Sequence, residues 1–502
     1  MISSRRLIWT AALLVFAACR VLPPAAGLDR AGQTVLGIAA AMALLWALDA
    51  APLGVTSLLA LVLLGTVPGL RPTQVFGGFA FPVVFFLIGG VAIAIAVERT
   101  GLAARVARQL LAGARGRPGR LYAQLLVSLP AMAVFLPSAI TRNAILIPAY
   151  RESLDAMGLR PTDGRARAVM LTLGVLNPLA SSALLTGGIA SMTAASLLGG
   201  FSWLRWFVLM AVPYYALLTL GAIALWLTSR AAGLEHRPVA ERAVHTPLTG
   251  PERRTLVVLL LTTTLWLTDA WHGLNPSIPA LLAALLLVAP GIGVFGWKDL
   301  EARLSWELIL TVGASLSLAS ALTSTTAAPW LGSLLTGTVT ELQTSPLALV
   351  GALIVIVTVV HLGITNLAAC LALLLPIVTT TTAAGGLNPL AIGLIVTVVV
   401  DAVILYPVQT ATNLIAYQTG YFTTADVRRF GFVMLGLTLG GDPRRRHPLL
   451  EADRPSARRD SLSATSAASL IPSSPAARSG STAATGSNRR RWRWRRCRRA
   501  HR

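Results

Sequence analysis

The stretch Leu45-Trp46-Ala47-Leu48-Asp49 returns 220 residues later as Leu265-Trp266-Leu267-Thr268-Asp269. Three further pairs recur at a constant spacing of 224 residues: Gly89 with Gly313, Thr141 with Thr365, and Thr186 with Thr410. Self-similarity at a fixed spacing indicates an architecture built from structural repeats. The sequence therefore predicts a fold made of two copies of one unit, each about 200 residues long.

The composition places both copies in a membrane. Of the 502 residues 55% are hydrophobic and 12% are charged, and the mean hydropathy is +0.69. Uncharged apolar windows occur at 32–48, 82–97, 206–228, 277–296 and 388–400. At about 1.5 Å per residue, windows of roughly 20 residues are long enough to span a bilayer. Because the windows are continuous rather than alternating, we expect an all-α polytopic membrane protein.

The net charge of +22 is concentrated at the C-terminal end. Residues 441–502 hold sixteen Arg against four acidic residues, so twelve of the 22 positive charges belong to this segment. Its Ser, Ala, Arg and Pro composition predicts a disordered Arg-rich tail with no specific nucleic-acid partner. The tail is either a native appendage that adheres to membrane lipid or the product of a reading-frame change. The three cysteines are far apart and show neither a disulfide nor a zinc spacing.

Charge also predicts the topology of the first half. An N-terminal transmembrane helix at 1–30 precedes a first repeat at 31–229. Six arginines between residues 99 and 120 place that loop, which includes an amphipathic helix, in the cytoplasm. The apolar segment 121–150 contains three prolines and is followed by four arginines, so both of its ends favour the cytoplasm. We therefore expect a re-entrant helical hairpin at 121–150, followed by an interrupted helix at 168–198.

The second half repeats this order with the opposite orientation. A cytoplasmic linker at 230–254 precedes a second repeat at 255–440, with a hairpin at 345–382 and an interrupted helix at 388–420. Each repeat has five transmembrane helices, so the second copy is inverted. Residues 323–345 contain no Lys or Arg and are expected to be an external connection. The last helix is expected to start at 430 and is about 18 Å long, too short to span.

The duplication pairs four polar stretches at membrane depth. They are the hairpin tips Pro137–Asn143 and Gly363–Asn366, and the helix interruptions Ser181–Gly188 and Pro407–Asn413. Small and hydroxyl residues of this kind can simply allow membrane helices to pack closely. Their register across two repeats, next to Pro or Gly, instead favours a site at which freed carbonyls hold a cation and helix N-termini attract an anion.

The chain resembles the divalent anion/sodium symporter family, which includes sodium-coupled dicarboxylate, citrate and sulfate carriers. The matching segments are Gly77–Pro82 leading to Glu98–Leu102, both hairpin tips with Pro148 and Pro376, and Pro407–Asn413 leading to Thr419–Phe422. The resemblance implies a scaffold domain, a transport domain, a homodimer and elevator-type alternating access. It also implies that each hairpin tip carries a Ser-Asn-Thr motif that binds the substrate anion and helps to hold sodium.

The first tip departs from that motif. Ser138 is kept, but Ala139 and Ile140 stand where Asn and Thr are expected, and Arg142 follows. Because a guanidinium is always charged, Arg142 either contacts the anion or occupies the place of a cation. This arrangement resembles that of the exchangers in the family. The substrate-binding candidates are Ser138, Thr141, Arg142, Thr186, Thr365, Asn366 and Thr410. The sodium candidates are Ser138, Gly187, Thr365, Asn366, Thr410, Thr412 and Asn413.

These features predict a secondary transporter of the bacterial inner membrane that moves a small divalent anion by sodium symport or by exchange. Sodium is the only coupling ion that the resemblance implies, and no other cofactor is expected. An alternative is a related carrier for sodium/proton antiport or arsenite efflux. An enzyme is not expected, because the sequence has no metal-spaced cluster and no nucleophile motif. Asp401 and His361 are two deep ionisable residues whose presence in the membrane is costly unless they are paired or functional.

Overall fold

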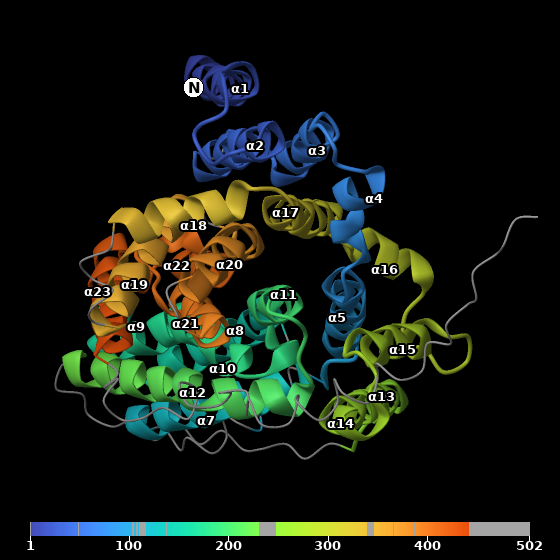
Figure 1. Ribbon diagram of the computed structural model, residues 1–502. Helices are drawn as coiled ribbons and strands as arrows, with labels where there is room; N and C mark the ends of the chain where they lie inside the picture. The colour runs from blue at the N-terminus through green and yellow to red at the C-terminus, as the bar shows by residue number, and fades with distance from the viewer. Residues whose placement is uncertain are drawn as a thin grey trace, which may run out of the picture. The chain divides into compact units, whose positions relative to one another are not determined.

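The structure is a computed structural model that describes residues 2–48, 50–102, 105–106, 109, 117–136, 138–229, 247–338, 346–364, 366–384 and 388–440. Within these ranges the chain is helical and contains no strand, which confirms the all-α prediction (Figure 1). Contacts divide the chain into residues 1–450 and 451–502, and all described helices belong to the first unit. The predicted tail at 441–502, Asp49, Thr365 and most of the predicted linker lie outside the described residues.

The first half contains long helices, short helical turns and one interrupted helix. In chain order the elements are α1 (Ile2–Val21), α2 (Arg30–Ala47), α3 (Leu53–Leu64), α4 (Pro72–Val75), η1 (Gly77–Ala80), α5 (Pro82–Arg99), α7 (Pro118–Phe135), α8 (Ala139–Ala156), α9 (Gly164–Leu171), η2 (Thr172–Leu176), α10 (Asn177–Ser182), η3 (Leu185–Gly187), α11 (Ile189–Leu197) and α12 (Trp203–Thr228). The turn η2 is π-helical, and α7 and α8 occupy the segment in which the first hairpin is predicted.

The second half also contains long helices, short helical turns and one interrupted helix. Its elements are α13 (Gly250–Leu267), α14 (Asp269–His272), α15 (Ser277–Val288), α16 (Trp297–Arg303), α17 (Trp306–Ser324), α18 (Ala327–Thr338), α19 (Pro346–Gly363), α20 (Leu367–Ala384), α21 (Pro389–Ala402), η5 (Pro407–Gln409), α22 (Ala411–Tyr417) and α23 (Thr424–Leu439). Three described helices, α5, α12 and α17, are long and apolar enough to cross a membrane by themselves. Shorter apolar helices accompany them, among them α2, α3, α15, α20 and α21.

The duplicated tryptophans make the same contact in both halves. The indole N–H of Trp46, in α2, donates a 2.9 Å hydrogen bond to the hydroxyl of Thr56 in α3. The indole N–H of Trp266, in α13, donates a 2.9 Å hydrogen bond to the carbonyl of Pro276, just before α15. Each acceptor stands ten residues after its tryptophan. The two copies of the sequence motif therefore close the same kind of helix connection.

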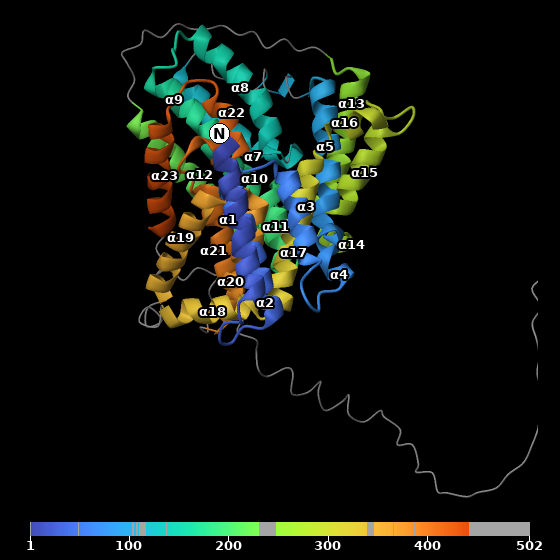
Figure 2. The ribbon, with the colours of Figure 1, turned by 90° about the horizontal axis from the view of Figure 1, so that it is seen from above.

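Equivalent helices of the two halves exchange partners (Figures 1 and 2). Helix α3 packs on α17, whereas α15 packs on α5; likewise α8 packs on α22, whereas α20 packs on α11. The duplicated glycines permit the close approaches. A Cβ on Gly89 would lie 2.5 Å from Ala280 in α15, and a Cβ on Gly313 would lie 2.4 Å from the ring of Phe79. Neither position has room for a side chain.

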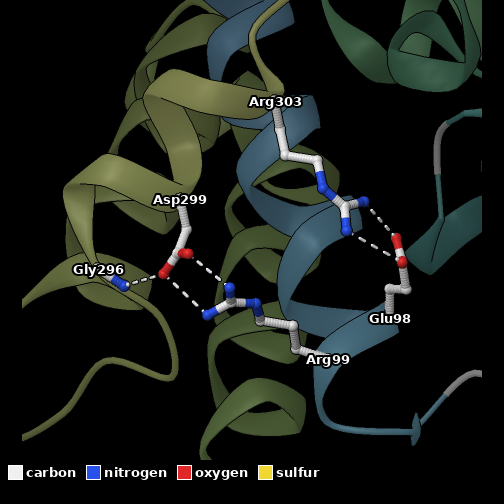
Figure 3. Close-up of polar contacts among 5 residues, drawn as sticks. All are labelled: Glu98, Arg99, Gly296, Asp299 and Arg303. Atoms are coloured by element: carbon white, nitrogen blue, oxygen red, sulfur yellow. Dashed lines mark hydrogen bonds and ion pairs between the residues drawn. The ribbon is translucent and has the colours of Figure 1, made fainter.

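Two ion pairs tie the halves together at one end (Figure 3). Arg99, the last residue of α5, donates a 2.8 Å hydrogen bond to Asp299 in α16, and Arg303 donates one of the same length to Glu98. The Gly296 N–H and the Arg99 guanidinium hold the pKa of the Asp299 carboxyl below its ordinary value. Figure 2 places this cluster and the start of α13 at one end of the helices, and α4 and α18 at the other.

One prediction about the second half needs correction, and one helix was not predicted. Helix α18 (Ala327–Thr338) lies within residues 323–345, for which the sequence predicted only an external position. The last helix starts at Thr424 rather than at 430, because the Thr423 hydroxyl accepts a hydrogen bond from the Asp426 N–H and the Asp426 carboxylate accepts one from the Thr423 N–H. This capping box lets the helix include Arg428 and Arg429. The observed α23 has 16 residues, which is about 24 Å.

Candidate functional site

Each predicted hairpin segment is divided into two helices, and the break lies just before α8 in the first and just before α20 in the second. Ser138 caps α8, its hydroxyl accepting a 3.2 Å hydrogen bond from the Thr141 N–H. Asn366 caps α20, its side-chain oxygen accepting a 2.9 Å hydrogen bond from the Ala369 N–H. Both helices have 18 residues, so each tip presents the positive end of a full helix dipole. Ser138, Thr141 and Asn366 are only half-buried, which leaves them accessible to a ligand.

The side chain of Arg142 is fully buried beneath the first tip. Its Nε donates to Asn177 Oδ1 at 2.9 Å, one terminal nitrogen donates to the Leu136 carbonyl at 2.6 Å, and the other donates to the Asn177 carbonyl at 3.0 Å. The guanidinium thereby joins the C-terminal end of α7 to Asn177, the first residue of α10. The negative end of the α7 dipole favours a cation at this place. A positive charge is built into the first tip.

Two buried asparagines extend this network to the second half. The side-chain amide of Asn177 donates to Asn143 Oδ1 at 2.7 Å. The side-chain amide of Asn143 donates to the Leu173 carbonyl at 2.9 Å and to the Thr412 carbonyl at 3.1 Å. The first tip, the first interrupted helix and the second interrupted helix therefore share one chain of hydrogen bonds. Asn177 was not among the predicted site residues, although the Asn177-Pro178 pair at a helix interruption is a signal that could have identified it.

The first interruption lies between α10 and α11. A Cβ on Gly187 would lie 1.5 Å from the Ser181 carbonyl oxygen, so only glycine fits there. The hydroxyl of Thr186 accepts a 3.1 Å hydrogen bond from the indole of Trp203. The Trp206 indole donates to the Ser182 carbonyl, also at 3.1 Å. Thr186 and Gly187 are thus buried and held by the start of α12, away from the Arg142 contacts.

The second interruption is closed by Gln409. Its side chain accepts from the Leu405 N–H at 2.8 Å and donates to the Val403 carbonyl at 3.1 Å. The hydroxyls of Thr410 and Thr412 lie 3.2 Å apart, and the Thr410 hydroxyl caps α22 by accepting from the Asn413 N–H. This connection also touches the second hairpin, because the Tyr406 hydroxyl donates to the Leu362 carbonyl at 2.6 Å.

Asn413 supplies an unusual oxygen. Its Oδ1 is buried without a hydrogen-bond partner in the part of the chain that the structure describes. The π-helical turn faces it, since a Cβ on Gly174 would lie 2.9 Å from this oxygen. A buried carboxamide oxygen suits a hard cation such as sodium better than a transition metal. Over the same described residues, no cluster of three or more His, Cys, Asp or Glu side chains could hold a metal ion.

The structure thus brings together part of the predicted constellation. Ser138, Thr141 and Arg142 connect through Asn143 to Thr412, beside Thr410 and Asn413. Thr186 and Gly187 lie at a separate interruption bound to α12, and Asn366 caps the second tip. Thr365 lies outside the described residues.

Known proteins resemble this chain over most of its length. It is 25% identical over 443 residues to the sodium-dependent dicarboxylate transporter SdcS of Staphylococcus saprophyticus, covering 80% of this chain and 83% of that protein. It is 24% identical over 385 residues to the L-tartrate/succinate antiporter of Shigella dysenteriae, covering 71% and 76%. A solved structure, the YdaH transporter of Alcanivorax borkumensis, aligns with a TM-score of 0.48 at 17% identity, over 73% of this chain and 86% of that one.

A family model described as the sodium:sulfate symporter transmembrane region matches residues 4–439. The match runs from the first helix to the last residue of α23 and includes both hairpins and both interrupted helices. The members of this family are transporters and not enzymes. The apolar helices of this chain and its family membership make it a multi-pass membrane protein. The chain belongs to the sodium:sulfate symporter family.

Proposed function

We propose that the protein is a secondary active transporter of small divalent organic anions in the bacterial inner membrane. The substrate class is dicarboxylates such as succinate or malate, with citrate and sulfate as further members. The observation that carries the proposal is the pair of half-buried helix N-termini at the hairpin tips, of which the first has Arg142 buried beneath it. Relatives that are named as dicarboxylate carriers support the same class.

Two helix N-termini suit a ligand with two negative groups. Each N-terminus offers backbone N–H donors and the positive end of a dipole, which favours a carboxylate or sulfate oxygen. Ser138 and Asn366 add side-chain donors beside those ends, and Thr141, Thr365, Thr186 and Thr410 are the further candidates. Because the Arg142 guanidinium is occupied by carbonyl groups, it acts on the anion through its charge and by fixing α8, rather than by direct contact.

The coupling ion belongs to the second tip. Arg142 supplies a permanent cation at the first tip, so Ser138 and Gly187 do not need to recruit sodium there. Thr365, Asn366, Thr410, Thr412 and Asn413 hold the sodium ion, with the unpartnered Asn413 oxygen as one ligand. Named relatives include both a sodium-dependent carrier and an antiporter. A protein that has a fixed cation at the first tip and a sodium site at the second combines a feature of each transport mode.

The proposed mechanism requires two inverted repeats. The exchanged packing of α3 with α17 and α15 with α5 supports a two-fold relation between the halves. The same relation in α8 with α22 and α20 with α11 supports a symmetric pair of tips. A transport domain that contains both tips would then slide as an elevator against the scaffold of a homodimer.

Uptake by the purified protein in proteoliposomes tests the proposal. Labelled succinate and sulfate are supplied with and without an inward sodium gradient, and with and without internal unlabelled anion. We expect succinate uptake that is stimulated by internal succinate and by sodium. Uptake of neither anion under any of these conditions would contradict the proposal. Sodium-driven proton efflux or arsenite efflux in the same vesicles would establish the alternative carrier class instead.

A further inference from the structure

Asp401 is a buried acidic residue that the proposed anion mechanism does not use. It is 3% exposed and lies one residue before the end of α21, just ahead of the second interruption. The Tyr214 hydroxyl in α12 donates a 2.8 Å hydrogen bond to Asp401 Oδ2. The hydroxyl of Ser182, the last residue of α10, also bonds to this carboxyl. The carboxyl therefore connects the ends of both interrupted helices through neutral groups.

No cation accompanies Asp401 in the described part of the protein. Helix α21 is packed by α10, α11, α12, α19, α20 and α23. The ionisable side chains on these six helices are Arg205, Tyr214, Tyr215, His361, Cys370, Asp426, Arg428 and Arg429. Arg205 is exposed and covers the Phe201 ring, the His361 ring bonds to the Ile364 carbonyl, and Asp426 pairs with Arg167. Among described residues, no hydrogen bond or ion pair joins Asp401 to Arg, Lys or His.

Three physical effects favour the neutral form of this carboxyl. Burial removes the water that would solvate a carboxylate, and a buried charge without a counter-charge is costly. The C-terminal end of α21 presents the negative end of its dipole to the side chain. A hydroxyl group can accept a hydrogen bond from a carboxylic acid as readily as it can donate one to a carboxylate, so both forms of Asp401 can be hydrogen-bonded. In the conformation described here, Asp401 is arranged to hold a proton.

The position of Asp401 couples that proton to an anion. Ser182 precedes the interruption that carries Thr186, and Asp401 precedes the interruption that carries Thr410. A dianion seated against these interruptions would repel an ionised Asp401 and would be tolerated beside a neutral one. Proton binding and anion binding therefore strengthen each other, and by linkage the strengthening is equal in both directions.

We propose that Asp401 is a proton-binding site and that one proton enters with each transported anion. The inference rests on the proposed function in one respect, namely that the cargo is an anion. On the loading side, an O–H bond of a hydronium ion breaks and an O–H bond forms on a carboxylate oxygen of Asp401, which leaves water and a carboxylic acid that donates a hydrogen bond to Ser182. On the releasing side the O–H bond of Asp401 breaks and the proton passes to water, which forms hydronium. No electron is transferred.

The experiment follows fumarate uptake into proteoliposomes that contain a trapped pH-sensitive dye. Fumarate is used because it stays doubly charged between neutral and mildly acidic pH. For the wild type we expect acidification of the lumen together with uptake, and a rate that rises by up to about tenfold per unit of falling external pH, the limit for one proton. For Asp401→Asn, which is permanently neutral, we expect no anion-dependent acidification and a flat pH profile. Glu301→Gln, at an exposed carboxyl in α16, is the matched control and should behave as the wild type.

Fumarate uptake by the wild type without lumen acidification, and with a flat pH profile, would overturn the proton site while leaving the transport proposal intact. If no anion is carried at all, the transport proposal fails, and difference infrared spectra then decide on Asp401 alone. A protonated-carboxyl stretch that titrates in the wild type and is missing in Asp401→Asn supports the site; its absence from the wild type refutes it. If Asp401→Asn does not fold, Tyr214→Phe is measured instead. Loss of the Tyr214 hydrogen bond should shift the pH profile of fumarate uptake to higher pH, and an unshifted profile refutes the proposal.

Discussion

At the scale of single residues, Arg142 illustrates how position gives a side chain its role. The sequence could predict that a permanent cation follows the first tip, and it left open whether this cation meets the anion or replaces a coupling ion. The structure shows a guanidinium turned inward, bound to the Leu136 and Asn177 carbonyls. Asn177 could not be predicted as its partner, because the two residues are 35 positions apart and meet only through packing.

Replacing Arg142 tests its structural role. In Arg142→Ala two buried carbonyls lose their donor, and removing one partner of a buried charged network costs roughly 3–5 kcal/mol. We expect a lower melting temperature and a raised KM for succinate, or loss of exchange. Arg142→Lys keeps the charge but cannot bridge both helices with a planar fork, so it should recover only part of the activity. A thermal melt and uptake kinetics of Arg142→Ala that match the wild type would exclude Arg142 from both the stability of the tip and the binding of the anion.

Asn366 at the second tip should be essential for transport. Its side chain caps α20 and is half-buried, so Asn366→Ala removes both a helix cap, worth about 1 kcal/mol, and a donor from the proposed anion site. We expect a folded protein with no measurable succinate uptake. Asn275→Ala, at an exposed asparagine before α15, is the matched control. Normal uptake by Asn366→Ala would exclude the second tip from the site.

At the scale of elements, hydrophobicity and proline positions predicted the interrupted helices, which the structure contains, whereas the re-entrant hairpins stay a prediction and capping decided several boundaries. Helix α18 went unpredicted because a short helix without Lys or Arg looks like an external connection when only charge is considered. The start of α23 went unpredicted because the apolar run begins only after Arg428 and Arg429, whereas the capping box of Thr423 and Asp426 starts the helix before them. The interruption near Gly187 was predicted, but the contact that requires glycine there depends on the folded backbone.

Two adjacent glycines provide a direct test of that interruption. In Gly187→Ala the new Cβ would overlap the Ser181 carbonyl oxygen at 1.5 Å, so the connection between α10 and α11 must open. In Gly188→Ala the nearest atom, the Ser182 hydroxyl oxygen, lies at an ordinary 3.9 Å. We expect Gly187→Ala to lose most succinate uptake and to elute broadly in size-exclusion chromatography. Gly188→Ala should retain both properties, and similar behaviour of the two variants would contradict the proposed close contact.

At the scale of the whole molecule, the sequence could predict an all-helical membrane protein and an internal duplication. The first prediction depends only on composition, and the second only on the spacing of matching residues. The prediction that the halves are related by a two-fold axis depended on the charges of the loops. The exchanged packing of α3, α5, α15 and α17 supports this prediction, and these long-range contacts could not be read from local sequence patterns. How tips and interruptions connect also required the fold, because Asn143 reaches Thr412 across 269 residues.

The duplicated halves end unequally, and this inequality affects the surrounding lipid. Helix α12 has 26 residues, about 39 Å, whereas α23 has 16, about 24 Å, in a bilayer whose hydrocarbon core is about 30 Å thick. Acyl chains beside α23 must shorten or disorder to meet it, so hydrophobic mismatch makes this flank prefer thin membranes. We expect succinate uptake to be faster in short-chain than in long-chain phosphatidylcholine vesicles at equal fluidity. A rate independent of chain length would mean that the neighbouring helices, rather than the lipid, absorb the mismatch.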